Sequence, residues 1–141
     1  MRFWDTSAIV PLLVVESATA DMRRFLDSDP AIVVWWTTRT EAVSALARQA
    51  RDGGLGASPA ARARTVLDAL SATWSEVVPS EQLRTRAERL LRVHALRAGD
   101  AFQLSAALLW SRGQTSGRGF VSLDDRLREA AGREGFRVLP D

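Results

Sequence analysis

The chain has 141 residues, a formal net charge of +2 and no cysteine, and 46% of its residues are hydrophobic. This length suits one domain over residues 1–141, and the apolar content is sufficient for a buried core. The absence of cysteine excludes disulfides and thiolate metal ligands, which agrees with a reducing, cytoplasmic setting. A single histidine argues against the usual zinc sites, so any bound metal should have oxygen ligands, as Mg²⁺ or Mn²⁺ does.

The isoelectric point of 10.7 overstates the basic character of the chain. All basic side chains are arginines, and neither lysine nor tyrosine is present to titrate between neutral pH and the arginines. The modest net charge is therefore the better guide, although single arginines can still bind phosphates.

The apolar run 9–15 follows Arg2 and precedes the small residues 18–20, which is the layout of a secretory signal. Asp5 before the run and Pro11 within it argue against that interpretation. No apolar run is long enough to span a bilayer, so we expect no membrane association.

Taken in chain order, apolar runs and helical periodicities alternate. Residues 2–4 predict a short strand, and Thr6 begins a helix through Leu12. The pattern then predicts helix 16–25, strand 31–35, a helix from Thr37 or Thr38 to Ala50, loop 52–59, a helix opened by Ser58-Pro59, strand 76–79, a helix capped by Ser80 through Leu91, helix 100–110, strand 119–123, helix 124–131 and strand 136–139. This alternation indicates an α/β domain whose parallel sheet is covered on both faces.

Four acids occupy similar positions, near strand ends or in the first turns of the predicted helices. They are Asp5, Glu41, Asp100 and Asp124. Each also has a structural interpretation. Asp5 and Asp100 can cap helices, and Thr38 with Glu41 has the spacing of a capping box. Ser122 and Asp125 have the same spacing, so the choice between Asp124 and Asp125 as the fourth acid stays open.

The four acids are stronger evidence for a functional site together than each is alone. Parallel strands bring their carboxyl ends to one edge of the sheet, where ligands collect in open α/β folds. Two carboxylates about 4 Å apart repel each other by roughly 4 kcal/mol at an effective dielectric constant of 20. A cluster of these carboxylates would therefore need a divalent cation or a proton to neutralise part of its charge. Oxygen ligation favours Mg²⁺, with Mn²⁺ as an alternative.

Other chemistry-bearing residues have simpler interpretations. His94 lies near a helix end among leucines, which is typical of a histidine at the edge of the core rather than a general base. The five tryptophans stand among apolar residues, which favours core or interface positions over base stacking.

Four segments together resemble the PIN domain, and within it the VapC-type ribonuclease toxins of bacterial toxin–antitoxin pairs. They are Phe3-Trp4-Asp5-Thr6-Ser7-Ala8, Thr38-Arg39-Thr40-Glu41-Ala42, the run 96–104 around Gly99-Asp100-Ala101, and Phe120-Val121-Ser122-Leu123-Asp124-Asp125-Arg126-Leu127. The tail 130–139 also fits, so the resemblance covers essentially the whole chain.

The resemblance implies a three-layer α/β/α sandwich with a central parallel sheet of four to five strands. It also implies a Mg²⁺-dependent endoribonuclease whose acidic cluster is Asp5, Glu41, Asp100 and Asp124. Asp5, Asp100 and Asp124 would be the metal ligands, and Ser7 and Ser122 would be supporting hydroxyls. Similar proteins act on tRNA, ribosomal RNA or mRNA, are inhibited by a cognate VapB-like antitoxin, and are often homodimers.

Two other functional classes compete with the nuclease. The acidic pocket could bind a metal or a partner's arginine without turnover, as a non-catalytic interaction module. Alternatively, Asp5 could be a phosphorylated aspartate. That hypothesis is weak because Ser7 replaces the second aspartate of haloacid-dehalogenase-like phosphatases, and receiver domains need a lysine that this chain lacks.

Overall fold

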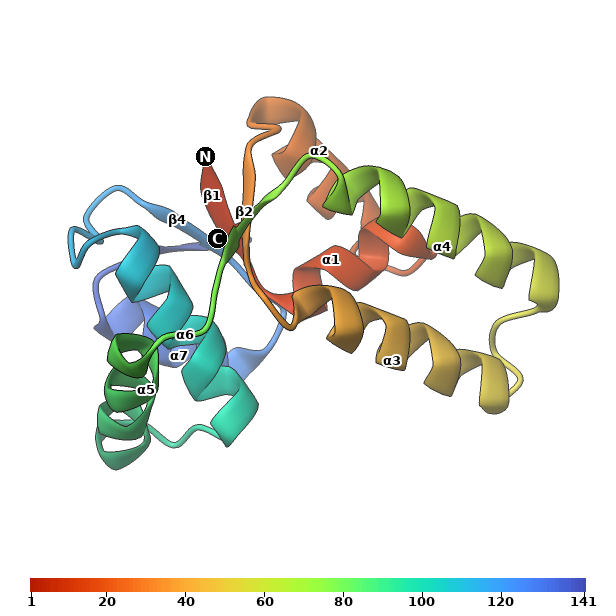
Figure 1. The fold of residues 1–141 in the computed structure, drawn as a ribbon. Helices are drawn as coiled ribbons and strands as arrows, with labels where there is room; N and C mark the ends of the chain where they lie inside the picture. The colour runs from red at the N-terminus through yellow and green to blue at the C-terminus, as the bar shows by residue number, and fades with distance from the viewer.

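Five short parallel strands run through the centre of the computed structural model, which describes all of residues 1–141 (Figure 1). The strands are β1 (Arg2–Trp4), β2 (Ile32–Trp35), β3 (Ser75–Val77), β4 (Gly119–Val121) and β5 (Arg137–Leu139). The helices are α1 (Thr6–Leu13), α2 (Thr19–Ser28), α3 (Thr38–Arg51), α4 (Ala57–Ser71), α5 (Glu81–Val93), α6 (Ala98–Trp110) and α7 (Asp125–Arg133). The predicted α/β class with a parallel sheet is confirmed.

The order of the strands places β1 at the centre of the sheet. The order is β3-β2-β1-β4-β5, and every neighbouring pair is parallel. The chain builds outward from β1 to β2 and β3, and then crosses to the other side of β1 for β4 and β5. The direction of winding therefore reverses between β1 and β4, which is where ligands bind in open parallel sheets.

Two apolar cores cover the two faces of the sheet. Trp4, Ile32 and Val34 pack with helices α1 to α4, whereas Phe3, Val33 and Trp35 pack with α5 to α7. Side chains alternate between the faces of a strand, so a strand buried on both faces reads as a continuous apolar run. The molecule therefore has the predicted three layers, with α1–α4 to the right of the sheet in Figure 1 and α5–α7 to the left.

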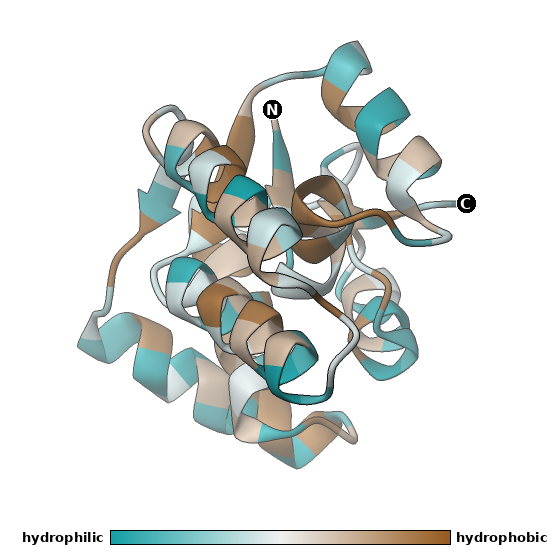
Figure 2. Ribbon diagram, turned by 90° about the vertical axis from the view of Figure 1, so that its right-hand side faces the viewer, coloured by the Kyte–Doolittle hydropathy of each residue, from teal (hydrophilic) through white to brown (hydrophobic).

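The hydropathy of the ribbon follows this layering. In Figure 2 brown apolar segments gather at the middle of the molecule, while the outer helices alternate brown and teal. Helices α3 and α4 pack against each other as a hairpin that extends away from the sheet in Figure 1. None of the helices has the combination of length and apolar character needed to cross a membrane.

Some predicted boundaries were wrong. The helix predicted over 16–25 spans Thr19–Ser28 instead, because the Thr19 hydroxyl holds a turn ahead of it. Thr19 Oγ1 accepts a hydrogen bond from Glu16 N and donates one to Pro11 O, both at 2.8 Å. Helix α4 begins at Ala57 after Gly56, before the predicted Ser58-Pro59 opening. The strand predicted over 119–123 ends at Val121 because the next two residues turn toward Asp5.

The core around β1 should dominate the stability of the fold. Phe3 is fully buried, and its ring stacks on Phe120 with a centroid distance of 5.4 Å. We predict that Phe3→Ala lowers the free energy of unfolding by about 3–5 kcal/mol, measured by urea denaturation. Val15→Ala is the control, since Val15 is 88% exposed and its truncation should change stability by less than about 0.5 kcal/mol. Equal effects of the two substitutions would contradict the assignment of the core.

Candidate functional site

Asp5 stands at the carboxyl end of the central strand and is almost completely buried. Its side chain is 6% exposed, and its backbone N–H donates to Val121 O at 2.9 Å, which ties it to β4. Its Oδ2 accepts hydrogen bonds from Ser7 N at 3.2 Å, Ser7 Oγ at 2.5 Å and Ser122 Oγ at 3.1 Å. Asp5 therefore caps α1, as the structural interpretation predicted, and also lies at the carboxyl ends of the paired strands β1 and β4.

The surroundings of Asp5 disfavour its negative charge. Burial raises the pKa of this carboxyl group to about 6, although the Ser7 and Ser122 hydroxyls act in the opposite direction. The charge of Glu41 also raises this pKa, as the smallest of the causes. A carboxyl group at a strand end with a pKa so far above its usual range is typical of a functional site.

Glu41 lies in the first turn of α3, where neutral polar side chains surround its carboxylate. It accepts hydrogen bonds from Thr6 Oγ1 at 2.6 Å, from Thr37 Oγ1, and from Gln103 Nε2 at 3.2 Å. The predicted capping box between Thr38 and Glu41 was wrong. Thr37 is the residue before the helix, and no side chain caps the helix N-terminus. Glu41 therefore binds side chains of α1 and α6 and the residue before α3 instead of capping its own helix, and its place in the catalytic cluster stays a prediction.

Gln103 connects three helices beneath Glu41. It is only 2% exposed, and its Nε2 also lies 3.0 Å from Thr6 Oγ1 and 3.3 Å from Thr38 Oγ1. Its Oε1 is buried without a hydrogen-bond partner. Sequence reasoning missed Gln103, Thr6 and Thr37. The available signal was an amide inside the otherwise small and apolar run of α6, where a buried polar group needs partners.

Asp100 and Asp124 lie at the starts of α6 and α7, and both carboxylates bind backbone N–H groups there. Asp100 is half-buried, as predicted, and its Oδ2 accepts from Arg97 N at 3.0 Å. Asp124 is exposed, and its Oδ1 accepts from Leu127 N at 2.9 Å, so Asp124 is the cap of α7. The alternative cap at Ser122 was wrong, because the Ser122 hydroxyl binds Asp5.

The site residues suit a hard cation by their chemistry, since all donors are carboxylate and hydroxyl oxygens. The positions of these side chains support a metal site less well than their chemistry does. The charge of Glu41 raises the pKa of Asp5, but no group of three or more histidine, aspartate or glutamate side chains is placed to hold a metal ion. The metal set of Asp5, Asp100 and Asp124 therefore stays a prediction. Burial raises the pKa of Asp5, and a cation beside this carboxylate would stabilise its charged form.

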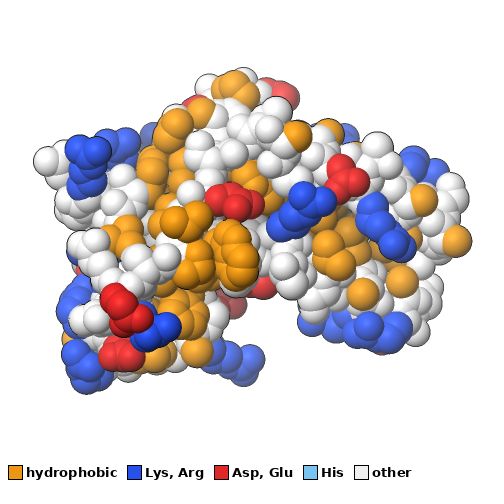
Figure 3. Space-filling view, viewed as in Figure 1, with side chains coloured by type: hydrophobic (Ala, Val, Ile, Leu, Met, Phe, Trp, Pro, Cys, Tyr) orange, Lys and Arg blue, Asp and Glu red, His pale blue; other side chains and the backbone are white.

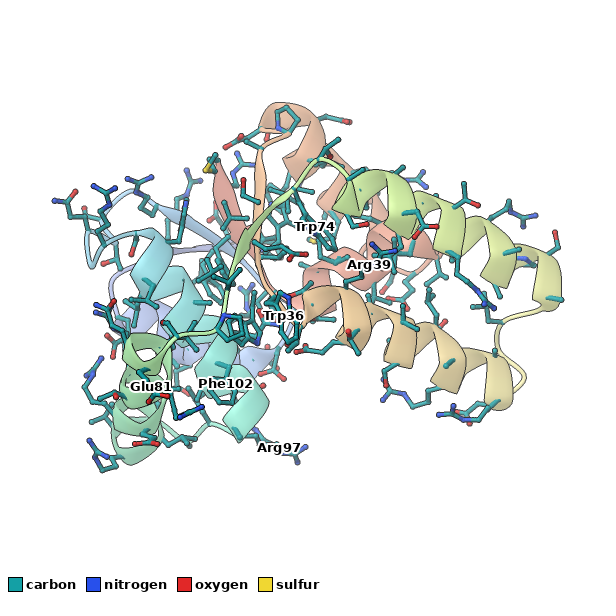
Figure 4. The ribbon with its side chains drawn as sticks, viewed as in Figure 1. Trp36, Arg39, Trp74, Glu81, Arg97 and Phe102 are labelled. Atoms are coloured by element: carbon teal, nitrogen blue, oxygen red, sulfur yellow. The ribbon has the colours of Figure 1, made fainter.

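Arg39 and Arg97, which lie close in sequence to Glu41 and Asp100, form no salt bridge with these acids. Arg39 binds Asp68 on α4 at 2.7 Å, and Arg97 extends away from the start of α6 (Figure 4). Figure 3, in the same view, shows hydrophobic side chains gathered near the middle of this face. His94 binds Glu134 at 2.8 Å, where it has a structural role as interpreted from the sequence.

The tryptophans divide between core and surface. Trp4, Trp35 and Trp74 are buried and Trp110 is half-buried, in line with the sequence interpretation. Trp36 is 53% exposed at the end of β2, immediately before the helix that carries Glu41. Figure 4 shows it at the junction between the two groups of helices.

Comparison with known proteins identifies the class of fold. The family model for the PIN domain matches residues 2–133, and the chain therefore belongs to the PIN domain family. No curated protein sequence matches the chain.

Two solved structures share the architecture. One is a toxin–antitoxin complex from Klebsiella pneumoniae, with 18% identity, a TM-score of 0.57, and coverage of 88% of this chain and 87% of that chain. The other is a protein from Pyrobaculum aerophilum, with 20% identity, a TM-score of 0.65, and coverage of 98% of this chain and 88% of that chain. At these identities the likeness shows the fold alone.

The raised pKa of Asp5 predicts a pH-dependent stability. A carboxyl group whose pKa rises from 3.8 to about 6 on folding favours the fold when protonated, and this stabilisation is lost as the pH rises from about 4 to 6. Without divalent cations, Asp5→Asn should therefore be more stable than the wild type at pH 7.5, by about 2–3 kcal/mol. The difference should shrink below about pH 4.

Urea denaturation at pH 7.5 and pH 4 measures this effect. Asp27→Asn is the control, because Asp27 is exposed and its side chain forms no hydrogen bond or ion pair. A wild type as stable as Asp5→Asn at pH 7.5 would show that the buried carboxyl group carries no such cost.

Proposed function

We propose that the protein is a divalent-metal-dependent endoribonuclease toxin of the VapC type, with a catalytic cluster of Asp5, Glu41, Asp100 and Asp124. PIN domains are usually nucleases, and this chain is a member of that family. The observation that carries the proposal is the buried Asp5 carboxyl group at the carboxyl ends of β1 and β4, whose pKa is raised by burial and, to a smaller extent, by the charge of Glu41.

Each residue has a role in the proposal. Asp5, Asp100 and Asp124 hold a Mg²⁺ or Mn²⁺ ion, and the Ser7 and Ser122 hydroxyls keep the Asp5 carboxylate in one orientation. The bound ion would lower the pKa of a water and stabilise charge on the phosphate. Glu41, held by Thr6, Thr37 and Gln103, supplies a further fixed negative charge at the site. Hydrolysis would leave a 5′-phosphate and a 3′-hydroxyl.

The proposed biological setting is a toxin–antitoxin pair. One structure with this fold is a toxin–antitoxin complex, which supports a VapB-like antitoxin as the protein partner. The substrate would be tRNA, ribosomal RNA or mRNA, and the active form a homodimer.

A second candidate is a non-catalytic module that binds a partner through the acidic pocket. It is favoured by one observation: Asp100 and Asp124 cap their own helices, and no three acids form a group around a common point. RNA cleavage separates the two candidates, because the module would bind a partner without turnover.

Substitution of the buried acid tests catalysis. With Mg²⁺ present, we predict that Asp5→Asn lowers the rate of RNA cleavage by at least about 100-fold, because substitutions around metal ligands already cost 10–100-fold. The measurement is the rate of product formation from a total RNA pool, with 5′-end sequencing of the products. Asp27→Asn should cleave at the wild-type rate. Cleavage by Asp5→Asn at that same rate would rule out the proposed active site.

Metal binding has a readout that needs no substrate. A ligand that binds only the folded state stabilises it, by about 2.7 kcal/mol at 100 times its dissociation constant. We predict that Mg²⁺ or Mn²⁺ raises the thermal midpoint of the wild type by several degrees at pH 7.5 and leaves that of Asp5→Asn unchanged. If both proteins responded equally, the ion would bind elsewhere.

A further inference from the structure

A cavity of about 700 Å³ lies where β1, β4 and β5 begin, on the opposite edge of the sheet from the candidate site. Arg2 at the start of β1 lines this cavity, whereas Asp5 follows the other end of the same strand (Figure 1). At about 3.3 Å per residue, Arg2 and Asp5 lie about 10 Å apart along the chain. The cavity is therefore separate from the residues of the proposed active site.

Three of the lining residues stand side by side on neighbouring strands. Gly119 on β4 pairs with Arg137 on β5, and the pairing of Phe3 with Phe120 places Arg2 beside Gly119. The two arginines therefore flank the glycine on one face of the sheet. A side chain on Gly119 would collide with Arg2, since a Cβ built there lies 2.9 Å from Arg2 Cγ. Strands about 4.8 Å apart separate the two arginine backbones by about 10 Å.

Arginines outnumber acids among the lining residues of this cavity. The basic side chains are those of Arg2, Arg24, Arg118 and Arg137. The acid is Asp29, which is paired with the amino group of Met1. An anion in the cavity would therefore meet an excess of positive charge.

Two of these arginines pair only with acids outside the cavity. Arg24 binds Asp21 at 3.1 Å, and Arg137 binds Asp141 at 3.2 Å. All four side chains are at least half exposed. Such solvent-exposed ion pairs contribute little free energy, so both guanidinium groups can turn toward a stronger anionic ligand.

The other two arginines are held in position. Arg2 Nη1 donates to Phe25 O at 2.6 Å and to Ser28 Oγ at 3.0 Å, so Arg2 also supports the end of α2. The guanidinium of Arg118 forms no hydrogen bond or ion pair and lies over the ring of Trp110, 5.1 Å from its centroid. A guanidinium that is already ordered loses less conformational entropy when it binds an anion.

The turn before β4 adds uncharged donors at the same cavity. Ser116 and Gly117 line it, and their backbone N–H groups form no hydrogen bond within the protein. Gly117 has a φ of 74°, a conformation that favours glycine. Consecutive free N–H groups in a turn are suited to bind anionic oxygens.

We propose that this cavity binds a small anion with two phosphate groups, held by Arg2, Arg118 and Arg137. Guanidinium groups bind phosphate oxygens through pairs of hydrogen bonds, and arginines that start about 10 Å apart suit an extended anion better than a single phosphate. The volume lies within the range of about 300–1,000 Å³ that is typical of small-molecule sites. The site needs no metal ion, so it does not depend on the proposed nuclease function.

The first test measures diphosphate binding without divalent ions. Sodium pyrophosphate is titrated calorimetrically in EDTA, at fixed ionic strength, into wild type, Arg118→Gln and Arg51→Gln. Arg118→Gln should weaken binding about 10-fold, the effect of losing a charge-assisted hydrogen bond. Arg51→Gln removes the same charge from an exposed side chain at the far end of α3 and should match the wild type. Asp5→Asn should also match it.

The second test adds a negative charge at the cavity. Ser116→Glu places a carboxylate among the lining residues, and repulsion should weaken pyrophosphate binding several-fold. Gln114→Glu is the matched control, because Gln114 is exposed on the same connection and does not line the cavity. Circular dichroism and urea denaturation confirm that both variants are folded.

A third titration, with adenosine diphosphate, distinguishes two sources of the diphosphate group. Binding that is tighter than that of pyrophosphate and equally dependent on Arg118 would support the proposal with a nucleotide as ligand. Equal affinity of the two compounds would support it with a free diphosphate as ligand.

Other outcomes would overturn the proposed diphosphate site. They are a wild type that binds no pyrophosphate, and binding that is unchanged in both Arg118→Gln and Ser116→Glu. Single-stranded RNA without a terminal phosphate could instead bind through Arg118 while pyrophosphate does not, which would make a nucleic-acid backbone the occupant. None of these results bears on RNA cleavage, and loss of the nuclease proposal would leave a measured diphosphate site in place.

Discussion

The buried carboxyl group of Asp5 is the constraint on which the candidate site depends. The fold places this acid at the end of the central strand, where little solvent can stabilise its charge. The hydroxyls of Ser7, which follows β1, and of Ser122, which follows β4, compensate for part of that cost. The remaining cost appears as the raised pKa of Asp5. An aspartate at the surface would cap α1 without this cost of burial, which is why the proposed function assigns the buried carboxyl group a role at the site.

The rest of the architecture holds the neighbours of Asp5 in place. The two cores fix β1 and β4 from both faces, and therefore fix Asp5 and Ser122 relative to each other. Gln103 on α6 joins Thr6 on α1 to Thr38 and Glu41 on α3. The second acid is thus positioned by three helices that are far apart in the sequence, which gives the site a rigid base. Asp100 and Asp124 stand at helix N-termini, where backbone N–H groups bind their carboxylates.

The sequence was informative where a local pattern determines the structure. The alternation of apolar runs and helical periodicities predicted the parallel sheet, and the run 31–35 predicted a strand buried on both faces. Asp5 could be identified because a strand and a helix meet there within a few residues. The four acids were predicted as candidates, but no three of them form a group placed to hold a metal ion, and only the charge of Glu41 affects the pKa of Asp5. Whether Asp100 and Asp124 join them at a cation stays a prediction.

The sequence was less informative where contacts are long-range. Glu41 was interpreted through Thr38, three residues away, whereas its hydrogen-bond partners come from α1, α6 and the residue before α3. Ser122 has capping-box spacing with Asp125, yet its hydroxyl donates to Asp5 on the neighbouring strand and Asp124 caps α7. Spacing along the chain cannot distinguish these cases, because a hydroxyl binds whichever partner the tertiary structure brings near it.

The most direct test of the account is anomalous diffraction from crystals of the wild-type protein grown with Mn²⁺. The account predicts an anomalous peak at the carboxyl ends of β1 and β4, bound by the Asp5 carboxylate together with Asp100 and Asp124. Crystals grown in saturating Mn²⁺ could instead show no ion at these strand ends, with the Asp100 and Asp124 carboxylates still bound to the N-termini of their helices. That result would contradict the proposed metal site.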